Sequence, residues 1–285
     1  MVVGVIGMGY VGTALNEGFK DCCQILTYDL KAELSSCDSI KALSSKSDLV
    51  FLCLPTPMNL DGSCNIDIVE NAISEINDIA DKNNQNLVLI IKSTVPPGTT
   101  DKLSSKYANV DIIFNPEFLT EANFIEDFKN QNRIILGGIE SSTIIVEQFY
   151  SKIFPKATII KTESTYAEMV KYFTNTFLAS KVSFANEMKL ICDKLNIDYD
   201  KVIEYAVYDK RLGATHLSAP GPDGKLGFGG SCFPKDINAL ISVASKLGVD
   251  PEILKSVWNT NLKVRPQKDW EALKGRAVTD NSSEE

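Results

Sequence analysis

The stretch GVIGMGYVGTAL, residues 4–15, decides the fold prediction. It carries Gly7, Gly9 and Gly12 in the pattern G-x-G-x-x-G, directly after an apolar, β-branched run and directly before a helix-like segment. In this context the glycines permit a tight turn, the close approach of a pyrophosphate, and close packing of a helix on a strand. The stretch therefore predicts the first strand, turn and helix of a dinucleotide-binding α/β fold.

An acidic residue ends the next strand-like run, QILTYD, residues 24–29. Asp29 comes about 20 residues after the glycines, where a carboxylate can accept hydrogen bonds from a ribose 2′-hydroxyl. A 2′-phosphate would be repelled there, so the sequence favours NAD over NADP as the cofactor. A purely structural glycine turn after a buried strand is the alternative explanation of the same pattern.

Strand-like and helix-like runs alternate through the first 162 residues, with helical patterns at 67–82 and 141–154. The strand-like runs are continuously apolar, which is typical of parallel strands covered by helices on both faces. We predict an α/β domain over residues 1–163, a Rossmann-type doubly wound parallel sheet. Its strands are expected at 2–7, 24–29, 48–55, 87–93, 111–116, 133–138 and 157–162.

Helical patterns replace the strands after residue 162. TYAE, residues 165–168, has the form of a capping box, with Thr165 as N-cap and Glu168 at the third helical position. The helix that follows is expected to reach about Leu195, with more apolar surface than one small domain can cover. We predict an all-helical domain over 164–265. Further helices are expected at 199–208, 234–247 and 251–264, the last two opening at Pro234 and Pro251, before a polar tail at 266–285 whose end, GRAVTDNSSEE, is expected to be frayed.

The composition excludes several classes of protein. A net charge of −8 without a basic stripe argues against nucleic-acid binding, and no apolar run reaches the length of a membrane span. The seven cysteines form no C-x-x-C motif, so no metal site is expected, and a reduced, cytoplasmic protein is favoured. The one histidine, His216, makes a Ser–His–Asp triad improbable and is expected in a loop.

One cysteine stands in an unusual setting, GFGGSCFPKD at 227–236. Cys232 is expected at or just before a helix N-terminus, whose partial positive charge stabilises a thiolate. Gly227 and Gly229 would let another molecule approach the backbone closely. These are conditions for a nucleophile. The alternative is a small buried hydrophobe, as expected for Cys53 inside an apolar strand.

Two further pairs of polar residues carry chemistry. Lys171 and Asn175 are four residues apart on the long helix, so they share a face and can stabilise an oxyanion together. A solvated helix face is the alternative explanation. Glu117 and Glu121, in NPEFLTEA, follow a strand end, at the edge of a doubly wound sheet where ligands bind.

Taken together, these motifs resemble the UDP-glucose/GDP-mannose dehydrogenase family, the nucleotide-sugar dehydrogenases. The matching stretches cover nearly the whole chain in order, and jointly they are specific. They are GVIGMGYVG, LPTP, KSTVPPGTT, NPEFLTEA, KYFTNTFLASKVSFANE, DKRLGATHL and GFGGSCFPKD.

The resemblance implies an enzyme that oxidises the sugar 6-hydroxymethyl group to a carboxylate, taking four electrons with two NAD in succession. Cys232 matches the family nucleophile, which forms a thiohemiacetal and then a thioester. Lys171 and Asn175 match the oxyanion-stabilising pair. The match gives two further roles, a catalytic water held by Asp236 and Thr94 and a general base for hydrolysis in Glu117.

The same matches imply binding residues and an assembly. Arg211 corresponds to an arginine that reaches the substrate of the partner subunit, so a homodimer is expected. The implied cofactor-binding residues are Gly7, Gly9, Tyr10, Val11, Gly12, Asp29, Pro55, Thr56 and Thr94, and the implied substrate-binding residues are Phe118, Leu119, Glu121, Lys171, Asn175, Arg211 and Gly229.

Two departures from the family pattern matter. The stretch between Asp29 and the third strand is short, which implies a trimmed helix on the adenine side of the cofactor. The family's third domain, which grips the uridine diphosphate, is not expected from the residues after 265, and this bears on the substrate. UDP-glucose is the predicted substrate, with UDP-glucuronate as product. GDP-mannose, a UDP-N-acetylhexosamine, or a catalytically silent nucleotide-binding protein are the alternatives. The segment APGPDGKLG, 219–227, would hold the diphosphate only if it folded over it, with Lys225 on a phosphate.

Overall fold

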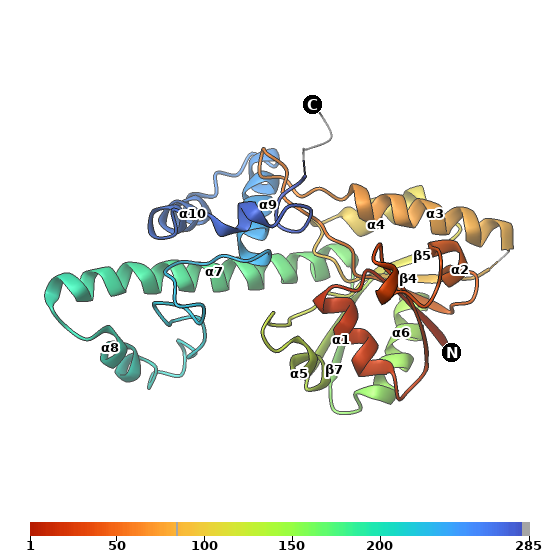
Figure 1. The fold of residues 1–285 in the computed structure, drawn as a ribbon, viewed down its shortest axis with the longest axis horizontal. Helices are drawn as coiled ribbons and strands as arrows, with labels where there is room; N and C mark the ends of the chain where they lie inside the picture. The colour runs from red at the N-terminus through yellow and green to blue at the C-terminus, as the bar shows by residue number, and fades with distance from the viewer. Residues whose placement is uncertain (84, 281–285) are drawn as a thin grey trace. The chain divides into compact units, whose positions relative to one another are not determined.

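The computed structural model describes residues 1–83 and 85–280 (Figure 1). The chain divides into two compact units. The sheet unit holds residues 1–56 and 66–171, and the helical unit holds residues 57–65 together with the described part of 172–285.

The sheet unit is built on one seven-stranded sheet with the strand order β2-β1-β3-β4-β5-β6-β7. Adjacent strands are parallel except β5 and β6, which are antiparallel and joined only through Phe114 and Gly137. The doubly wound sheet is confirmed, but the last two strands run opposite to the others. An antiparallel neighbour can begin at the edge where the preceding strand ends, so this connection need not cross the sheet. The strands are β1 Val2–Ile6, β2 Gln24–Tyr28, β3 Leu49–Leu52, β4 Val88–Ile91, β5 Asp111–Phe114, β6 Arg133–Gly137 and β7 Thr158–Thr162.

Helices cover both faces of this sheet because its strands are apolar on both sides. Alternate residues of β3 show the division, since Phe51 packs with the first group of helices and Leu52 with the second. The first group is α1 Tyr10–Phe19, α5 Phe124–Lys129 and α6 Glu140–Ile153, and the second is α2 Ile40–Ser44, α3 Asp67–Asn83 and α4 Thr99–Lys106; a short 3₁₀ turn, η1 Ala32–Leu34, follows β2.

The helical unit confirms the predicted helical region. Two small clusters form its core, one around Tyr199 and Leu217 and the other around Phe228 and Ile237. Its elements are α7 Ser164–Leu195, which starts in the sheet unit, α8 Tyr199–Ala206, α9 Cys232–Lys246, α10 Glu252–Val264 and η2 Asp269–Ala272.

Two predicted helix starts are wrong. Helix α9 begins at Cys232, so Pro234 is its third residue, and Pro251 precedes α10 rather than opening it. The capping box at the start of α7 does not form, because the Glu168 carboxylate binds the residues that open α4 instead. Thr165 donates its hydroxyl hydrogen to Asp101 at 3.0 Å.

Part of the polar tail, including the first residues of the predicted frayed end, is packed and hydrogen-bonded within the helical unit. Trp270 is 1% exposed and its ring centre lies 5.2 Å from that of Trp258. The backbone of Met58 donates to Ala277 and accepts from Thr279, at 2.9 Å in each case. The prediction of a frayed end is therefore wrong for residues 275–279, and residues 281–285 lie outside the described residues.

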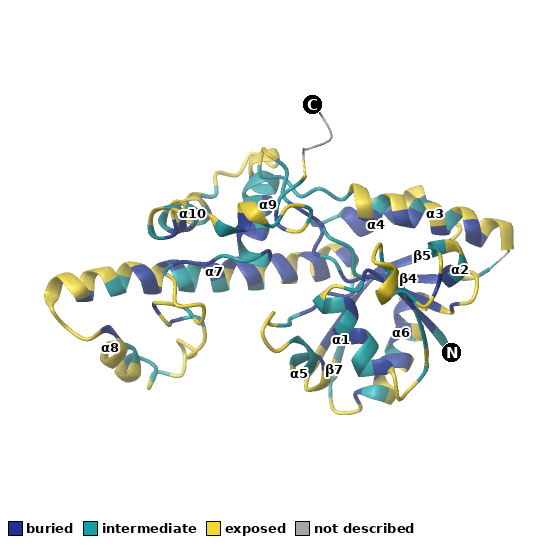
Figure 2. Ribbon diagram, viewed as in Figure 1, coloured by how far each residue is buried: buried dark blue, intermediate teal, exposed yellow. Residues whose placement is uncertain are grey.

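One side of α7 is exposed along much of its length (Figure 2). Phe173, Phe177 and Phe184 are 64%, 57% and 61% exposed. The rings of Phe173 and Phe177 are stacked, with centroids 6.2 Å apart. In the part of the chain that the structure describes, neither α7 nor any other helix combines the length and apolarity of a membrane span.

Candidate active site

The turn between β1 and α1 has the shape of a phosphate cradle. Gly7 has a φ of +89°, and a Cβ on Gly12 would lie 2.0 Å from the Gly7 carbonyl oxygen, so neither position accepts a side chain. A Cβ on Gly9 would meet no atom within 4 Å, which leaves open space beside the turn. Helix α1 begins directly after Gly9, whose position makes no side-chain cap, and a helix N-terminus of this kind favours an anion. These residues fit a dinucleotide pyrophosphate.

Asp29 lies directly beside this turn, at the end of β2. Its carboxylate accepts hydrogen bonds from the backbone amides of Met8, at 2.7 Å, and Lys31, at 2.9 Å. The acid is thereby fixed in place and half-buried at the edge of the cradle. This is the position that the ribose prediction requires.

The other predicted cofactor residues lie in or after the first strands. Tyr10 packs edge-on against Phe124, with ring centroids 6.2 Å apart, and Val11 packs into the core beneath the turn. Pro55 and Thr56 follow β3, and the Thr56 hydroxyl donates to the carbonyl oxygen of Thr94, after β4, at 2.8 Å. The predicted cofactor residues thus follow successive strands at one edge of the sheet.

Glu117 and Lys171 form a buried ion pair in the sheet unit. The Lys171 ammonium donates to the Glu117 carboxylate at 2.9 Å and to its carbonyl oxygen at 2.6 Å. Burial opposes the charge on Glu117, but Lys171 and the amide of Leu119 hold the pKa of this carboxyl below its usual value. The Phe118 ring centre lies 5.5 Å from the Lys171 ammonium, and Glu121 is exposed.

A second polar cluster lies in the helical unit. The Asn175 amide donates to the Asp236 carboxylate at 2.6 Å, and the Lys235 ammonium donates to its other oxygen at 2.6 Å. Burial alone would lower the pKa of Lys235, but the Asp236 carboxylate raises it above the ordinary lysine value. Asp236 is 1% exposed, so its carboxylate is paired with Lys235 inside the protein rather than with water.

Cys232 is the first residue of α9, half-buried and close to this cluster in sequence. Its sulfur lies 3.8 Å from the hydroxyl of Ser231. Cys53 is also half-buried and directly follows β3, so it does not lie inside the strand as predicted. It packs against the apolar core of the sheet unit, and burial raises the pKa of its thiol to about 12. The difference between the two cysteines is therefore the helix start at Cys232 rather than the degree of burial.

The glycines before Cys232 serve a different purpose from the one predicted. A Cβ on Gly227 would lie 2.4 Å from the Asn261 amide oxygen, and one on Gly229 would lie 2.5 Å from the Arg265 guanidinium. These positions make room for side chains of α10 rather than for a bound molecule. Substrate contact by Gly229 stays a prediction and would involve its backbone.

Arg211 and Lys225 are at the surface. Arg211 is 89% exposed in its side chain and pairs with Asp209. Lys225 lies 3.8 Å from Asp269, a weak surface pair. The segment around Lys225 is attached to α10, since Asp223 accepts a hydrogen bond from Arg265 at 2.6 Å.

Several residues around these clusters were missed by the sequence analysis. Glu168, Asn261 and Arg265 are buried and hydrogen-bonded to residues far away in the chain, and Lys92 is buried against Asn115 at 2.8 Å. Of these residues only Arg265 has a partner nearby in the sequence, because Asp269 lies four positions later, a spacing typical of ion pairs.

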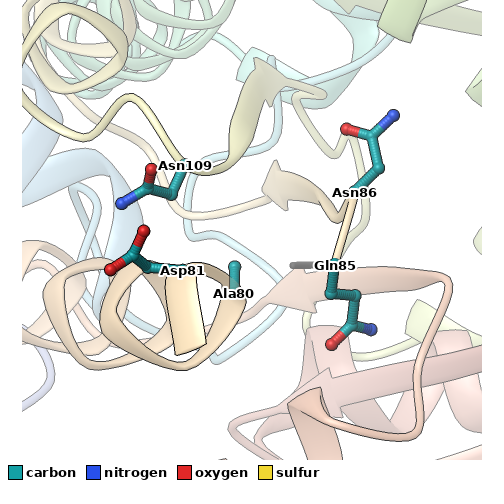
Figure 3. Close-up of a pocket in the computed structure, with 5 residues that line it drawn as sticks. All are labelled: Ala80, Asp81, Gln85, Asn86 and Asn109. Carbon is teal, nitrogen blue, oxygen red and sulfur yellow. The ribbon is translucent and has the colours of Figure 1, made fainter. Parts of the chain in front are cut away.

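A pocket of about 330 Å³ lies elsewhere in the sheet unit (Figure 3). Asn86 precedes β4 and Asn109 precedes β5, so this pocket is at the amino ends of the strands. Ligands of doubly wound sheets bind at the carboxyl ends. None of its lining residues belongs to the predicted site. Within the described ranges, no three His, Cys, Asp or Glu residues are grouped as a metal site would need.

The structure brings the predicted residues together in two sets. Glu117 contacts Lys171 in the sheet unit, and Asn175 contacts Asp236 in the helical unit. Lys171 and Asn175 are one turn apart on the same helix, α7. The ion pair belongs to the sheet unit, whereas the amide held by a carboxylate and the thiol at a helix start belong to the helical unit. Ammonium and amide donors can stabilise an oxyanion, and a thiol can carry a covalent intermediate.

Two models of one protein family match the chain. The NAD-binding domain of the UDP-glucose/GDP-mannose dehydrogenase family matches residues 20–157, and the central domain of that family matches residues 165–263. The phosphate cradle lies wholly before the first of these ranges, and α7 lies almost wholly within the second.

Individual relatives agree. UDP-glucose 6-dehydrogenase TuaD of Bacillus subtilis is 31% identical over 92% of this chain and 63% of its own length. UDP-glucose 6-dehydrogenase of Rickettsia bellii is 37% identical over 77% of this chain and 50% of its own length. The chain thus spans only part of the length of these curated relatives.

Solved structures give the same result. A UDP-glucose dehydrogenase from the archaeon Pyrobaculum islandicum is 30% identical, with a TM-score of 0.83 over 92% of this chain and 68% of that one. A GDP-mannose dehydrogenase from Pseudomonas aeruginosa is 25% identical, with a TM-score of 0.69 over 93% of this chain and 69% of that one. The chain therefore belongs to the UDP-glucose/GDP-mannose dehydrogenase family, and it carries that family's NAD-binding domain.

Proposed function

We propose that this chain oxidises the 6-hydroxymethyl group of UDP-glucose to the carboxylate of UDP-glucuronate. The observation that carries the proposal is the pairing of Asn175 with Asp236, in the helix that begins at Cys232. Cys232, Asn175 and Asp236 thereby belong to one compact unit. Lys171 lies one turn from Asn175 on α7. The names of the relatives, mostly UDP-glucose 6-dehydrogenases, favour this sugar.

The role of Cys232 follows from its place at the start of α9. The partial positive charge of a helix N-terminus stabilises a thiolate, and the thiolate attacks the aldehyde formed by the first oxidation. A carbon–sulfur bond forms and the carbonyl oxygen becomes an oxyanion, giving a thiohemiacetal. Its oxidation gives a thioester, which water hydrolyses to release the acid and the thiol. Bound NAD supplies the hydride acceptor for each of the two oxidations.

Lys171 and Asn175 stabilise the oxyanion. An ammonium has three donors, and the hydrogen bonds to Glu117 use two of those on Lys171. The third can bind developing negative charge. Asn175 is oriented by Asp236, which fixes the direction of its amide. Glu117, held ionised beside Lys171, is the proposed base for thioester hydrolysis, and Asp236 and Thr94 are proposed to hold the attacking water.

The cofactor-binding and substrate-binding roles of the other predicted residues belong to the same proposal. Asp29 would bind the ribose of NAD and disfavour NADP, and Phe118, Leu119 and Glu121 would line the sugar site. Arg211 is proposed to reach the substrate of a partner subunit. Its high exposure supports this, because a side chain that acts across an interface must extend from its own subunit.

The test is to follow NADH formation with NAD and a panel of nucleotide sugars: UDP-glucose, GDP-mannose and UDP-N-acetylhexosamines. We expect two NADH per UDP-glucose, and at least a 1,000-fold lower rate of acid formation, on the order of a lost covalent nucleophile, in Cys232→Ser. NAD binding should persist in that variant.

Cys53→Ser is the matched control and should keep the rate. Acid formation at the wild-type rate by Cys232→Ser would refute the covalent mechanism. If another nucleotide sugar is turned over in preference to UDP-glucose, that sugar is the substrate and the UDP-glucose assignment is wrong. NAD binding without NADH formation from any sugar would favour a catalytically silent nucleotide-binding protein.

A further inference from the structure

A carboxylate that the proposed chemistry does not use is completely buried in the first turns of α7. Glu168 is 0% exposed. It accepts hydrogen bonds from the backbone amide of Gly98 at 2.6 Å, from the backbone amide of Thr100 at 2.8 Å, and from the Thr100 hydroxyl at 2.7 Å. Among the residues that the structure describes, no lysine or arginine pairs with it.

Such a group is costly to keep. A buried carboxylate normally has a cation partner, since its removal from water is strongly unfavourable. Burial raises the pKa of Glu168 to about 7, although the bonds from Thr100 and Gly98 oppose the shift, and the nearby Asp101 raises it further. A residue that served only to fill space would be better replaced by an apolar side chain of similar volume.

The position of Glu168 gives a reason to keep it. Gly98 is the N-cap of α4 and Thr100 is its second residue, so the carboxylate caps this helix from another element. The segment that it holds runs back from Gly98 to Thr94, which follows β4. Lys171 lies three residues after Glu168, on the same side of α7.

We propose that Glu168 is a positioning residue that holds the segment 94–100 against the start of α7, so that Thr94 and Lys171 keep a fixed separation. Its catalytic consequence rests on the proposed function, in which Thr94 holds water and Lys171 binds the oxyanion. The neighbouring bond from Thr165 to Asp101 joins the same two helices but is exposed to water.

Ionisation completes this contact. The ionised carboxylate accepts all three hydrogen bonds, whereas a protonated oxygen becomes a donor and cannot accept from the amide or hydroxyl that faces it. The groups that face Glu168 are the amides of Gly98 and Thr100, the Thr100 hydroxyl and, as the nearby charge, Asp101. The contact should therefore strengthen as the pH rises through about 7.

The kinetic experiment compares Glu168→Gln with Glu163→Gln, an exposed glutamate in the same region. The glutamine amide would present a donor to the Gly98 or Thr100 donors. We expect kcat to fall about tenfold, the loss from a small displacement of reacting groups, while the Kd for NAD and the KM for the sugar stay within about twofold of wild type. Because the contact strengthens with pH, kcat of the wild type should rise through pH 7. This rise should disappear in Glu168→Gln and persist in Glu163→Gln.

A measurement that needs no turnover tests the contact itself. In the wild type, amide hydrogen exchange at Gly98 and Thr100 should show protection factors that rise from pH 6 to pH 8, and Glu168→Gln should abolish the rise. Thr100→Val, which removes one donor and keeps the volume, should reduce it even if the glutamine variant folds poorly. Wild-type kcat and pH profile in a folded Glu168→Gln, or protection independent of pH, would overturn the proposal. Inactivity of the wild type with every sugar would instead overturn the proposed function, and the exchange data would still decide the role of Glu168.

Discussion

The sheet unit and the aromatic face of α7 in the helical unit differ in how far their aromatic side chains are exposed. In the sheet unit, Phe19, Phe51 and Tyr150 are at most 1% exposed and pack on one another with ring centroids 5.5–6.2 Å apart. In the helical unit, Phe173 and Phe177 are more than half exposed. A sheet covered by its own helices is complete, whereas a helix with an aromatic face still needs a partner surface.

Both units bury charged side chains, whereas the face of α7 that carries Phe173 and Phe177 is open to water. The buried ones are Lys92, Glu117, Glu168 and Lys171 in the sheet unit and Asp236 and Arg265 in the helical unit. Substitutions should therefore affect the stability of the sheet unit strongly and that of the exposed α7 face little. Three variants test this, in order of decreasing effect on the free energy of unfolding.

Gly12→Ala should have the largest effect. The new Cβ would lie 2.0 Å from the Gly7 carbonyl oxygen, a backbone atom that cannot move without distorting the turn. We expect a loss of about 3 kcal/mol in the free energy of unfolding, measured by urea denaturation, and loss of NAD binding. Gly9→Ala is the matched control, because its Cβ meets no protein atom within 4 Å. It should keep the stability but weaken NAD binding; equal stability of both variants would contradict the tight turn.

Lys92→Met should have an intermediate effect that depends on pH. Burial lowers the pKa of Lys92 to about 8 from 10.5, so the native state binds fewer protons than the unfolded state between these values. The wild type should therefore gain stability as the pH rises through this window, by about 2 kcal/mol between pH 7.5 and pH 10. Below about pH 8 the burial penalty is fully present.

The variant should lack that gain in urea denaturation. The Asn115 amide oxygen would still accept the hydrogen bond from Tyr150, at 2.7 Å, which limits the damage at neutral pH. Lys102→Met, at an exposed position, should leave the pH dependence as in the wild type. The same gain in wild type and Lys92→Met would show that Lys92 is not responsible.

Phe177→Ser should have the smallest effect on stability and the clearest effect on assembly. Because this ring is 57% exposed, we expect the unfolding free energy of the isolated chain to change by less than about 0.5 kcal/mol. We propose that the α7 face pairs with a second copy, so light scattering at micromolar concentration should show a dimer for the wild type and a smaller species for the variant. Leu60→Ser, 92% exposed in the loop 57–65, is the control and should leave the mass unchanged. A monomeric wild type would refute the dimer.

Features with a local signal were predictable from the sequence. Each strand is a short apolar run, and all seven were found within a few residues. The predicted site residues of the sheet unit mostly follow strand ends, because ligands of such sheets bind there. The place of Cys232 at a helix start also followed from neighbouring residues, although the helix begins two residues before Pro234.

The missed features depend on partners far away in the chain. Glu168 binds residues 68 and 70 positions earlier, so its TYAE context suggested a local cap that does not form. A Cβ on Gly229 would meet the guanidinium of Arg265, a residue that directly follows a later helix. The antiparallel pairing of β5 and β6 could not be predicted from the sequence, because an apolar strand has the same composition whichever direction it runs.

The loop Pro57–Asn65 makes the helical unit discontinuous along the chain. It leaves the sheet segment after β3, and its Met58 exchanges backbone hydrogen bonds with Ala277 and Thr279, more than 200 residues later. A fragment cut at the start of α7 would lack this loop and would leave those two backbone groups without their partner. Closing the helical unit therefore depends on a contact between residues more than 200 positions apart, and such non-local contacts slow folding.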